Sequence, residues 1–128
     1  MNTTDRHFQI FQKEAQYWIG RLGLTGWDIR FVHQDLAGDS NAAAFFEAGE
    51  DITNRIATIG LARSDFKRKL TSDYIKLCAF HEVCELLLHR IQYLAKSRYC
   101  QEEDIDEERH NLIRIFENCV FQSRKSIK

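Results

Sequence analysis

Three neighbouring ionisable residues, His81, Glu82 and Glu85, lie near the middle of a largely apolar segment that spans residues 75 to 91. At about 100° per residue of a helix, His81 and Glu85 are one turn apart and point the same way. An imidazole and a carboxylate at this spacing place their donor atoms close enough to bind one zinc ion, with a third ligand from elsewhere. Glu82, beside such an ion, would be positioned as a general base toward metal-bound water. The spacing therefore predicts part of a zinc site.

An ion pair or hydrogen bond within the helix is the alternative interpretation of His81 and Glu85, because such pairs are common at this spacing. It would lie buried beside the last helix and extend to Arg109 or Arg114. Cys84 lies between the two residues on the same face. The other three cysteines are interpreted as small buried thiols, since the chain has no CxxC spacing.

The segment that carries these residues is apolar on two sides. Cys78, His81, Glu85 and others share one side of the helix, while Val83 and Leu86 lie opposite. A helix of this kind is usually central in a fold, where an uncompensated charge is costly. We therefore expect the polar residues to be buried and to have a compensating partner, with a metal ion as the sharpest hypothesis.

Length and composition set the broad class. The chain has 128 residues, 44% of them hydrophobic and 29% charged, so residues 1–128 are expected to form a single globular domain. No apolar run is long enough to cross a bilayer, and the amino-terminal segment lacks a signal-peptide pattern. A formal net charge of −1 without a basic stripe argues against a nucleic-acid partner. The expectation is a cytoplasmic protein with no membrane association.

The periodicity of apolar residues gives the order of the elements. It predicts an α+β domain: a helix, a three-stranded and mostly antiparallel sheet, then two helices on one face of the sheet. The strand over residues 52–61 is expected near the sheet edge, joined to its predecessor by a turn at residues 49–51. The predicted elements are a helix from about Asp5 to Arg21, strands beginning near Trp27, Ala42 and Ile52, and helices from Thr71 or Ser72 to about Ala95 and from Glu102 to Phe121.

The motif HEVCE at residues 81–85 resembles the first half of an HExxH zinc motif, with Glu85 in place of the second histidine. Together with Phe80, Leu86, Leu87 and Leu88 and the segment EERHNLIRIFEN, it makes the chain similar to the small, gluzincin-like zincin metallopeptidases of bacteria and phages. The resemblance implies that the last helix supplies a glutamate as the third zinc ligand. Glu108 matches this position best, and Glu107 and His110 remain alternatives.

The resemblance implies a zinc-dependent metallopeptidase, or a divergent relative, that hydrolyses peptide bonds through metal-activated water. Zinc would be held by His81, Glu85 and Glu108, with Glu82 as the base. The carboxylate of Glu85 makes the site more nearly neutral than one with two histidines, so the metal would polarise water less strongly. The alternative is a catalytically inactive zincin-fold factor, of a phage or prophage, that binds another protein.

Overall fold

The computed structural model describes residues 2–35, 43–48, 55–64 and 69–122. It confirms the predicted α+β order of one helix, three strands and two helices. The predicted turn at residues 49–51 lies outside the described residues. The elements are α1 (Asp5–Arg21), β1 (Asp28–Gln34), β2 (Ala44–Ala48), β3 (Ile56–Ala62), α2 (Ser72–Lys96), α3 (Glu102–Phe116) and a short π-helical segment, η1 (Glu117–Phe121).

The two long helices begin at threonine caps. Thr4 Oγ1 accepts from the backbone N–H of His7 at the start of α1, and Thr71 Oγ1 accepts from the backbone N–H of Tyr74 at the start of α2. Each hydroxyl satisfies one of the backbone donors that a helix start leaves without a partner. The capping residues therefore fix where both helices begin.

The sheet has the order β1-β3-β2, so β3 is the central strand and not an edge strand as expected. β1 runs parallel to β3 and β2 antiparallel to it, which makes the sheet mixed instead of mostly antiparallel. The reason lies in β3 itself, because it is buried almost continuously from Ala57 to Ala62, apart from a half-buried Thr58. A nearly unbroken apolar run is typical of a strand covered on both edges and both faces.

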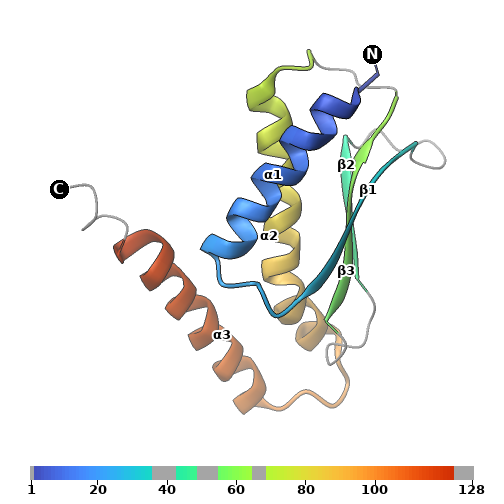
Figure 1. Cartoon of the computed structure of the whole chain (residues 1–128). Coiled ribbons are helices and arrows are strands. Elements are labelled where there is room, and N and C mark those ends of the chain that lie inside the picture. The colour runs from blue at the N-terminus through green and yellow to red at the C-terminus, as the bar shows by residue number, and fades with distance from the viewer. Residues whose placement is uncertain (1, 36–42, 49–54, 65–68, 123–128) are drawn as a thin grey trace.

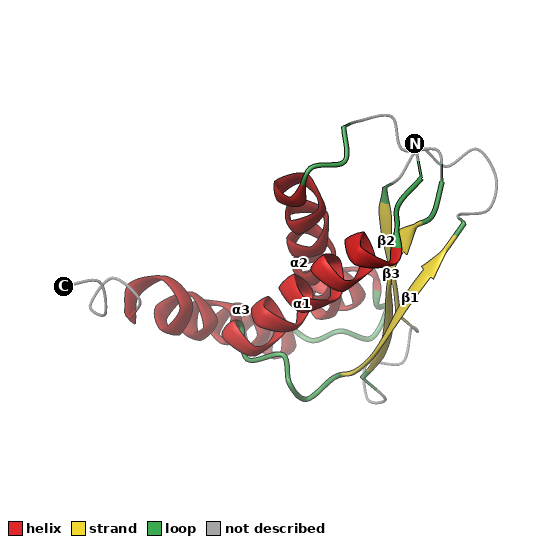
Figure 2. Cartoon of the chain, turned by 45° about the horizontal axis from the view of Figure 1, so that its top comes forward, coloured by secondary structure: helices red, strands yellow, loops and turns green. Residues whose placement is uncertain are grey.

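α1 and α2 lie side by side and form a helical layer against the sheet (Figures 1 and 2). The core between these layers contains Phe11 of α1, Ile59 and Leu61 of β3, and Ile75 and Leu86 of α2, all almost completely buried. α2 is thus the central helix that its two-sided apolar pattern predicted.

α3 lies on the far side of the helical layer from the sheet, and it extends away from the body (Figures 1 and 2). Leu112, Ile115 and Cys119 pack against the core from this helix and η1. The end of the segment is tied to α1, because Arg21 Nη2 donates to the Cys119 carbonyl over 3.1 Å. In the described part of the chain no helix is long and apolar enough to span a membrane.

Candidate functional site

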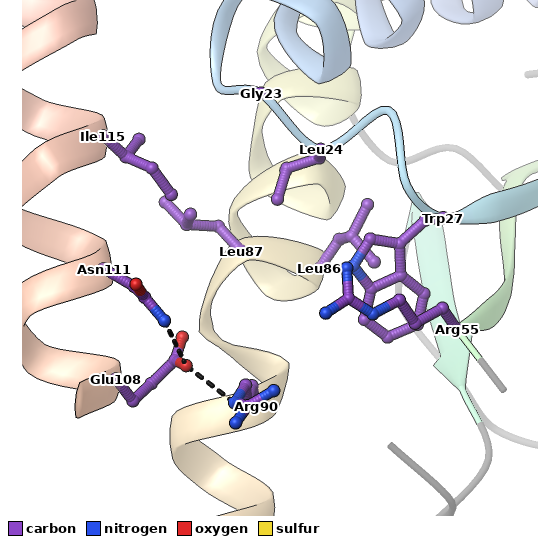
Figure 3. Close-up of a pocket in the computed structure, with 10 residues that line it drawn as sticks. All are labelled: Gly23, Leu24, Trp27, Arg55, Leu86, Leu87, Arg90, Glu108, Asn111 and Ile115. Atoms are coloured by element: carbon purple, nitrogen blue, oxygen red, sulfur yellow. Dashed lines mark hydrogen bonds and ion pairs between the residues drawn. The ribbon is translucent and has the colours of Figure 1, made fainter. Parts of the chain in front are cut away.

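His81 and Glu85 lie together on α2, as the sequence predicted. His81 Nε2 is 3.6 Å from Glu85 Oε1, and the two side chains are 70% and 49% exposed. The expectation that they are buried is therefore wrong. α3 packs along another side of α2, where it meets Leu87 and Arg90, so it does not cover this pair (Figure 3).

The distance between His81 Nε2 and Glu85 Oε1 is found both between two ligands of one metal ion and in a weak ion pair. Two ligands bound to one tetrahedral zinc ion, each roughly 2.1 Å from it, lie about 3.4 Å apart. The distance between His81 Nε2 and Glu85 Oε1 is therefore compatible with two positions of a zinc site.

Glu82 is the buried acid of this segment. It is only 6% exposed, on the inward side of α2 with Val83 and Leu86. Burial raises its pKa from 4.5 to about 7, with a smaller lowering by His81 and a smaller raising by Glu85. A carboxyl group with a pKa near 7 can take up and release a proton at neutral pH.

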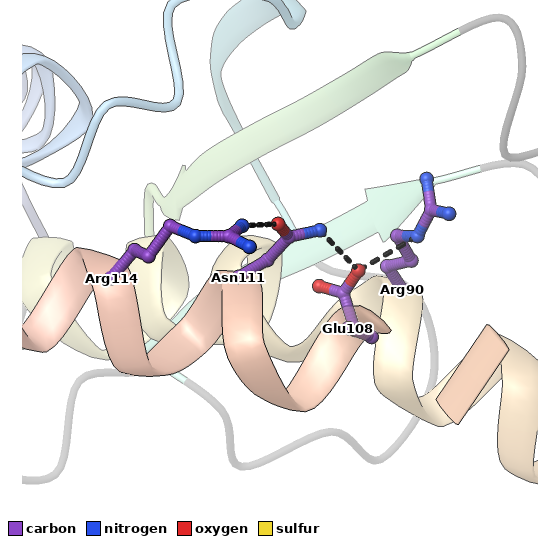
Figure 4. A network of polar contacts seen from close by, with 4 residues as sticks. All are labelled: Arg90, Glu108, Asn111 and Arg114. Carbon is purple, nitrogen blue, oxygen red and sulfur yellow. Dashed lines mark hydrogen bonds and ion pairs between the residues drawn. The ribbon is translucent and has the colours of Figure 1, made fainter. Parts of the chain in front are cut away.

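Glu108, the predicted third ligand, is engaged elsewhere. Its Oε2 lies 2.8 Å from Arg90 Nε of α2, and Asn111 Nδ2 donates to the same oxygen over 3.5 Å (Figure 4). The N–H of Arg90 Nε is buried and makes no hydrogen bond to a described acceptor, so the contact with Glu108 is a charge attraction without hydrogen-bond geometry. Arg114 Nη1 donates to Asn111 Oδ1 over 2.6 Å and extends this network along α3.

The alternative third ligands, Glu107 and His110, are both exposed. The His110 ring is held by its own helix, with Nδ1 2.8 Å from the Asp106 carbonyl oxygen. Among the described residues, no three histidine, cysteine, aspartate or glutamate side chains are grouped so as to hold a metal ion. The described residues therefore fit two zinc ligands, His81 and Glu85, and do not supply the third.

Cys84, which the sequence placed between the two candidate ligands, is half-buried. Burial raises the pKa of its thiol, and the nearby Glu85 raises it further. The thiolate that a metal or an electrophile requires is therefore disfavoured at neutral pH.

A pocket of about 270 Å³ lies at the junction of α2 and α3 (Figure 3). Its polar lining consists of Arg55, Arg90, Glu108 and Asn111, and its apolar lining includes Trp27. Arg55 has a left-handed backbone with φ +50°, which is uncommon for a residue other than glycine. No sequence pattern indicated this site, because its residues come from four separate segments.

A second concave surface lies where α1, α2 and the end of α3 meet. It encloses about 420 Å³ and is mainly apolar; its lining includes Tyr17, Trp18, Phe80, Phe116 and Val120. The rings of Trp18 and Phe80 meet edge to face, with centroids 4.8 Å apart. We call this surface the aromatic groove.

Comparison with protein-family models, with curated proteins and with solved structures gives no match to this chain.

Proposed function

We propose that this chain is a non-catalytic protein-binding domain on a zincin-like scaffold. The binding surface consists of the aromatic groove and the outward side of α3 and η1, and its partner is an amphipathic helix of another protein molecule. The observation that carries this proposal is the exposure of large apolar side chains on one helix. Ile113, Phe116 and Val120 are 45%, 51% and 63% exposed.

Several exposed apolar side chains along one surface are a recognised mark of a binding site, whereas single ones are ordinary. Phe116 and Val120 also line the aromatic groove, so the exposed side of the helix continues into a concavity. Tyr17 and Trp18 in that groove are residue types that supply much of the binding energy at protein interfaces. An amphipathic helix has the shape and the apolar side to occupy such a groove.

The surroundings of the predicted site residues support a structural role for them. A zincin would use the same positions to bind metal or to catalyse. Glu108 is paired with Arg90 and joins α3 to α2. Glu82 lies among apolar core residues on the inward side of α2, while His81 and Glu85 face solvent. A binding domain needs no third metal ligand, and its fold benefits from the contact between Glu108 and Arg90.

Photo-crosslinking tests the proposal. A benzophenone amino acid placed at position 116 should form a covalent adduct with a protein that mass spectrometry then identifies. The matched control is position 77, because Leu77 is 60% exposed on a different element, α2. The identified partner, once purified, should bind the Phe116→Glu variant at least about tenfold more weakly than the wild type. The proposal fails if position 116 gives no protein adduct beyond that at position 77.

A zinc-dependent peptidase, or a divergent relative, is the second candidate. The distance of 3.6 Å between His81 and Glu85 and the pKa of about 7 at Glu82 favour it. Metal analysis of chain purified without chelator tests it directly, with His7→Ala on α1 as the control for His81→Ala. Zinc at one equivalent that is lost in His81→Ala and kept in His7→Ala would support this candidate. A chain that contains no zinc, and takes up none at micromolar concentrations, would exclude it.

A further inference from the structure

We infer that the partner at this surface is a second copy of the same chain, with the two α3 helices antiparallel across a two-fold axis. This inference rests on the proposed function, because it names the partner of the same surface. It follows from the spacing of the exposed side chains and from the distribution of charge along the helix.

The exposed apolar residues of α3 and η1 form a seam, defined here by Ile105, Ile113, Phe116 and Val120. Phe116 lies three residues after Ile113, and Arg109 occupies the position four residues before Ile113. Val120 follows in the π-helical segment η1, so the α-helical spacing covers only the members within α3. Alternating steps of three and four are the pattern by which two helices pack along a shared seam.

This seam is distinct from the side of α3 that faces the rest of the chain. On a helical wheel at about 100° per residue, the seam positions within α3 lie beside the positions of Glu108, Leu112 and Ile115 without overlapping them. Those three residues are buried or half-buried against the body. α3 thus has one apolar side that packs within the chain and an adjacent one that faces outward.

Charge selects the antiparallel orientation. The first turns of α3 carry five acidic residues between positions 102 and 107, and the basic residues Arg109 and Arg114 follow. A parallel pair would bring the two acidic segments together, and like charges at this distance repel. An antiparallel pair separates them and directs each toward the opposite end of the second helix. The sequence after that end carries Arg124, Lys125 and Lys128, outside the described residues.

The position of the largest side chains suits a two-fold axis. Ile113 and Phe116 lie near the middle of the seam, so an antiparallel copy sets them against the same two residues of the second copy. A surface that is complementary to itself in this way gives a closed dimer.

Sedimentation equilibrium across a concentration series tests the pairing. The wild type should show a monomer–dimer equilibrium, and Phe116→Glu and Ile113→Glu should each weaken it at least about tenfold. Leu77→Glu, at an equally exposed apolar position on α2, should leave it unchanged. Circular dichroism should show that all variants keep the fold. A dimer that neither seam substitution weakens would overturn the inference.

Disulfide trapping tests the orientation. In an antiparallel pair, Ile113→Cys should form a linked dimer readily, because position 113 lies near the axis. Glu103→Cys should not, since about ten residues at about 1.5 Å each separate it from that point. The unmodified chain, with its four native cysteines, gives the background. Preferential linkage at position 103 would overturn the antiparallel arrangement.

Failure of the self-pairing can be distinguished from failure of the proposed binding function. A chain that stays monomeric at about 100 μM, yet crosslinks through position 116 to a different protein, would remove the self-pairing and leave the binding function standing. A monomeric chain without any adduct at position 116 would remove both.

Discussion

Arg90 of α2 and Glu108 of α3 approach to 2.8 Å between Nε and Oε2, and the Glu108 side chain is almost completely enclosed. α3 has no contact with the sheet comparable to its contact with α2, so this pair contributes directly to holding the helix against the body. The Glu108 carboxylate neutralises the Arg90 guanidinium, and its main role is to hold α3 against α2.

Glu108→Ala should lower the free energy of unfolding by about 2 kcal/mol, because it leaves the buried Nε of Arg90 without its counter-charge. Loss of α3 packing should also accelerate amide hydrogen exchange in residues 105–116. Asp106→Ala is the matched control, since its pair with Arg109 is exposed and its atoms are 3.5 Å apart. The control should cost less than about 0.5 kcal/mol by chemical denaturation. Equal costs for the two variants would contradict the role given to Glu108.

Glu82 should make stability depend on pH. Its pKa is about 7 in the folded chain against 4.5 ordinarily, so between these values the folded state binds more protons than the unfolded state. Stability should therefore fall as pH rises from 4.5 to 7, by about 2 kcal/mol after allowance for residual solvent screening.

Glu82→Gln should remove this loss, and at pH 8 it should raise the melting temperature by roughly 5 to 10 °C over the wild type. Glu85→Gln, at an exposed position on the same helix, should keep most of the wild-type pH dependence, because burial raises the pKa of Glu82 more than Glu85 does. Thermal denaturation from pH 5 to pH 8 measures both variants. A stability difference between Glu82→Gln and wild type that does not grow with pH would contradict the assignment.

Gly60 of β3 should tolerate no side chain. A Cβ at this position would overlap the ring of Phe45 on β2 and lie 2.8 Å from Val32 Cγ2 on β1. Gly60→Ala should therefore lower stability by about 2 kcal/mol. Gly20→Ala is the control, because a Cβ there meets nothing within 4 Å and alanine favours the helix. The control should gain about 0.5 to 1 kcal/mol in the same denaturation experiment.

Thr3 should anchor the amino-terminal segment to the sheet. Its hydroxyl donates to the Ala62 carbonyl over 2.6 Å and lies 2.6 Å from His33 Nε2, so the hydroxyl oxygen accepts a hydrogen bond from the Nε2–H of that ring. Thr3→Val keeps the shape, removes both bonds, and should cost about 1 to 3 kcal/mol. Thr3→Ser keeps the hydroxyl group and should therefore retain most of the stability that Thr3→Val loses. Nitrogen chemical shifts should show His33 protonated at Nε2 in the wild type; a proton on Nδ1 alone would contradict this arrangement.

The sequence predicted the helices well because capping residues and periodicity are local signals. The first helix was placed over Asp5 to Arg21, as observed, and the second ends within one residue of the prediction. Strand order was not predictable in the same way, because pairing joins residues far apart in the chain. Nothing near β3 indicates that its neighbours are both β1 and β2.

The candidate site was predictable only within one helix. The spacing of His81 and Glu85 follows from helical geometry, and the two residues do meet. The place of Glu108 depends on how α3 packs, and the partner that the structure provides is Arg90. Arg90 is distant from Glu108 in sequence, so the apolar periodicity of α3 does not indicate that the two residues meet.

The central position of β3 has a consequence for synthesis of the chain. β1 and β2 each pair with β3, so no strand pair can form until residues 56–62 have left the ribosome. The first helix and first strand must wait, with their apolar residues uncovered, while about half of the chain is made. The nascent chain should therefore acquire its sheet in a single late step, and it should depend on chaperones most strongly just before that strand emerges.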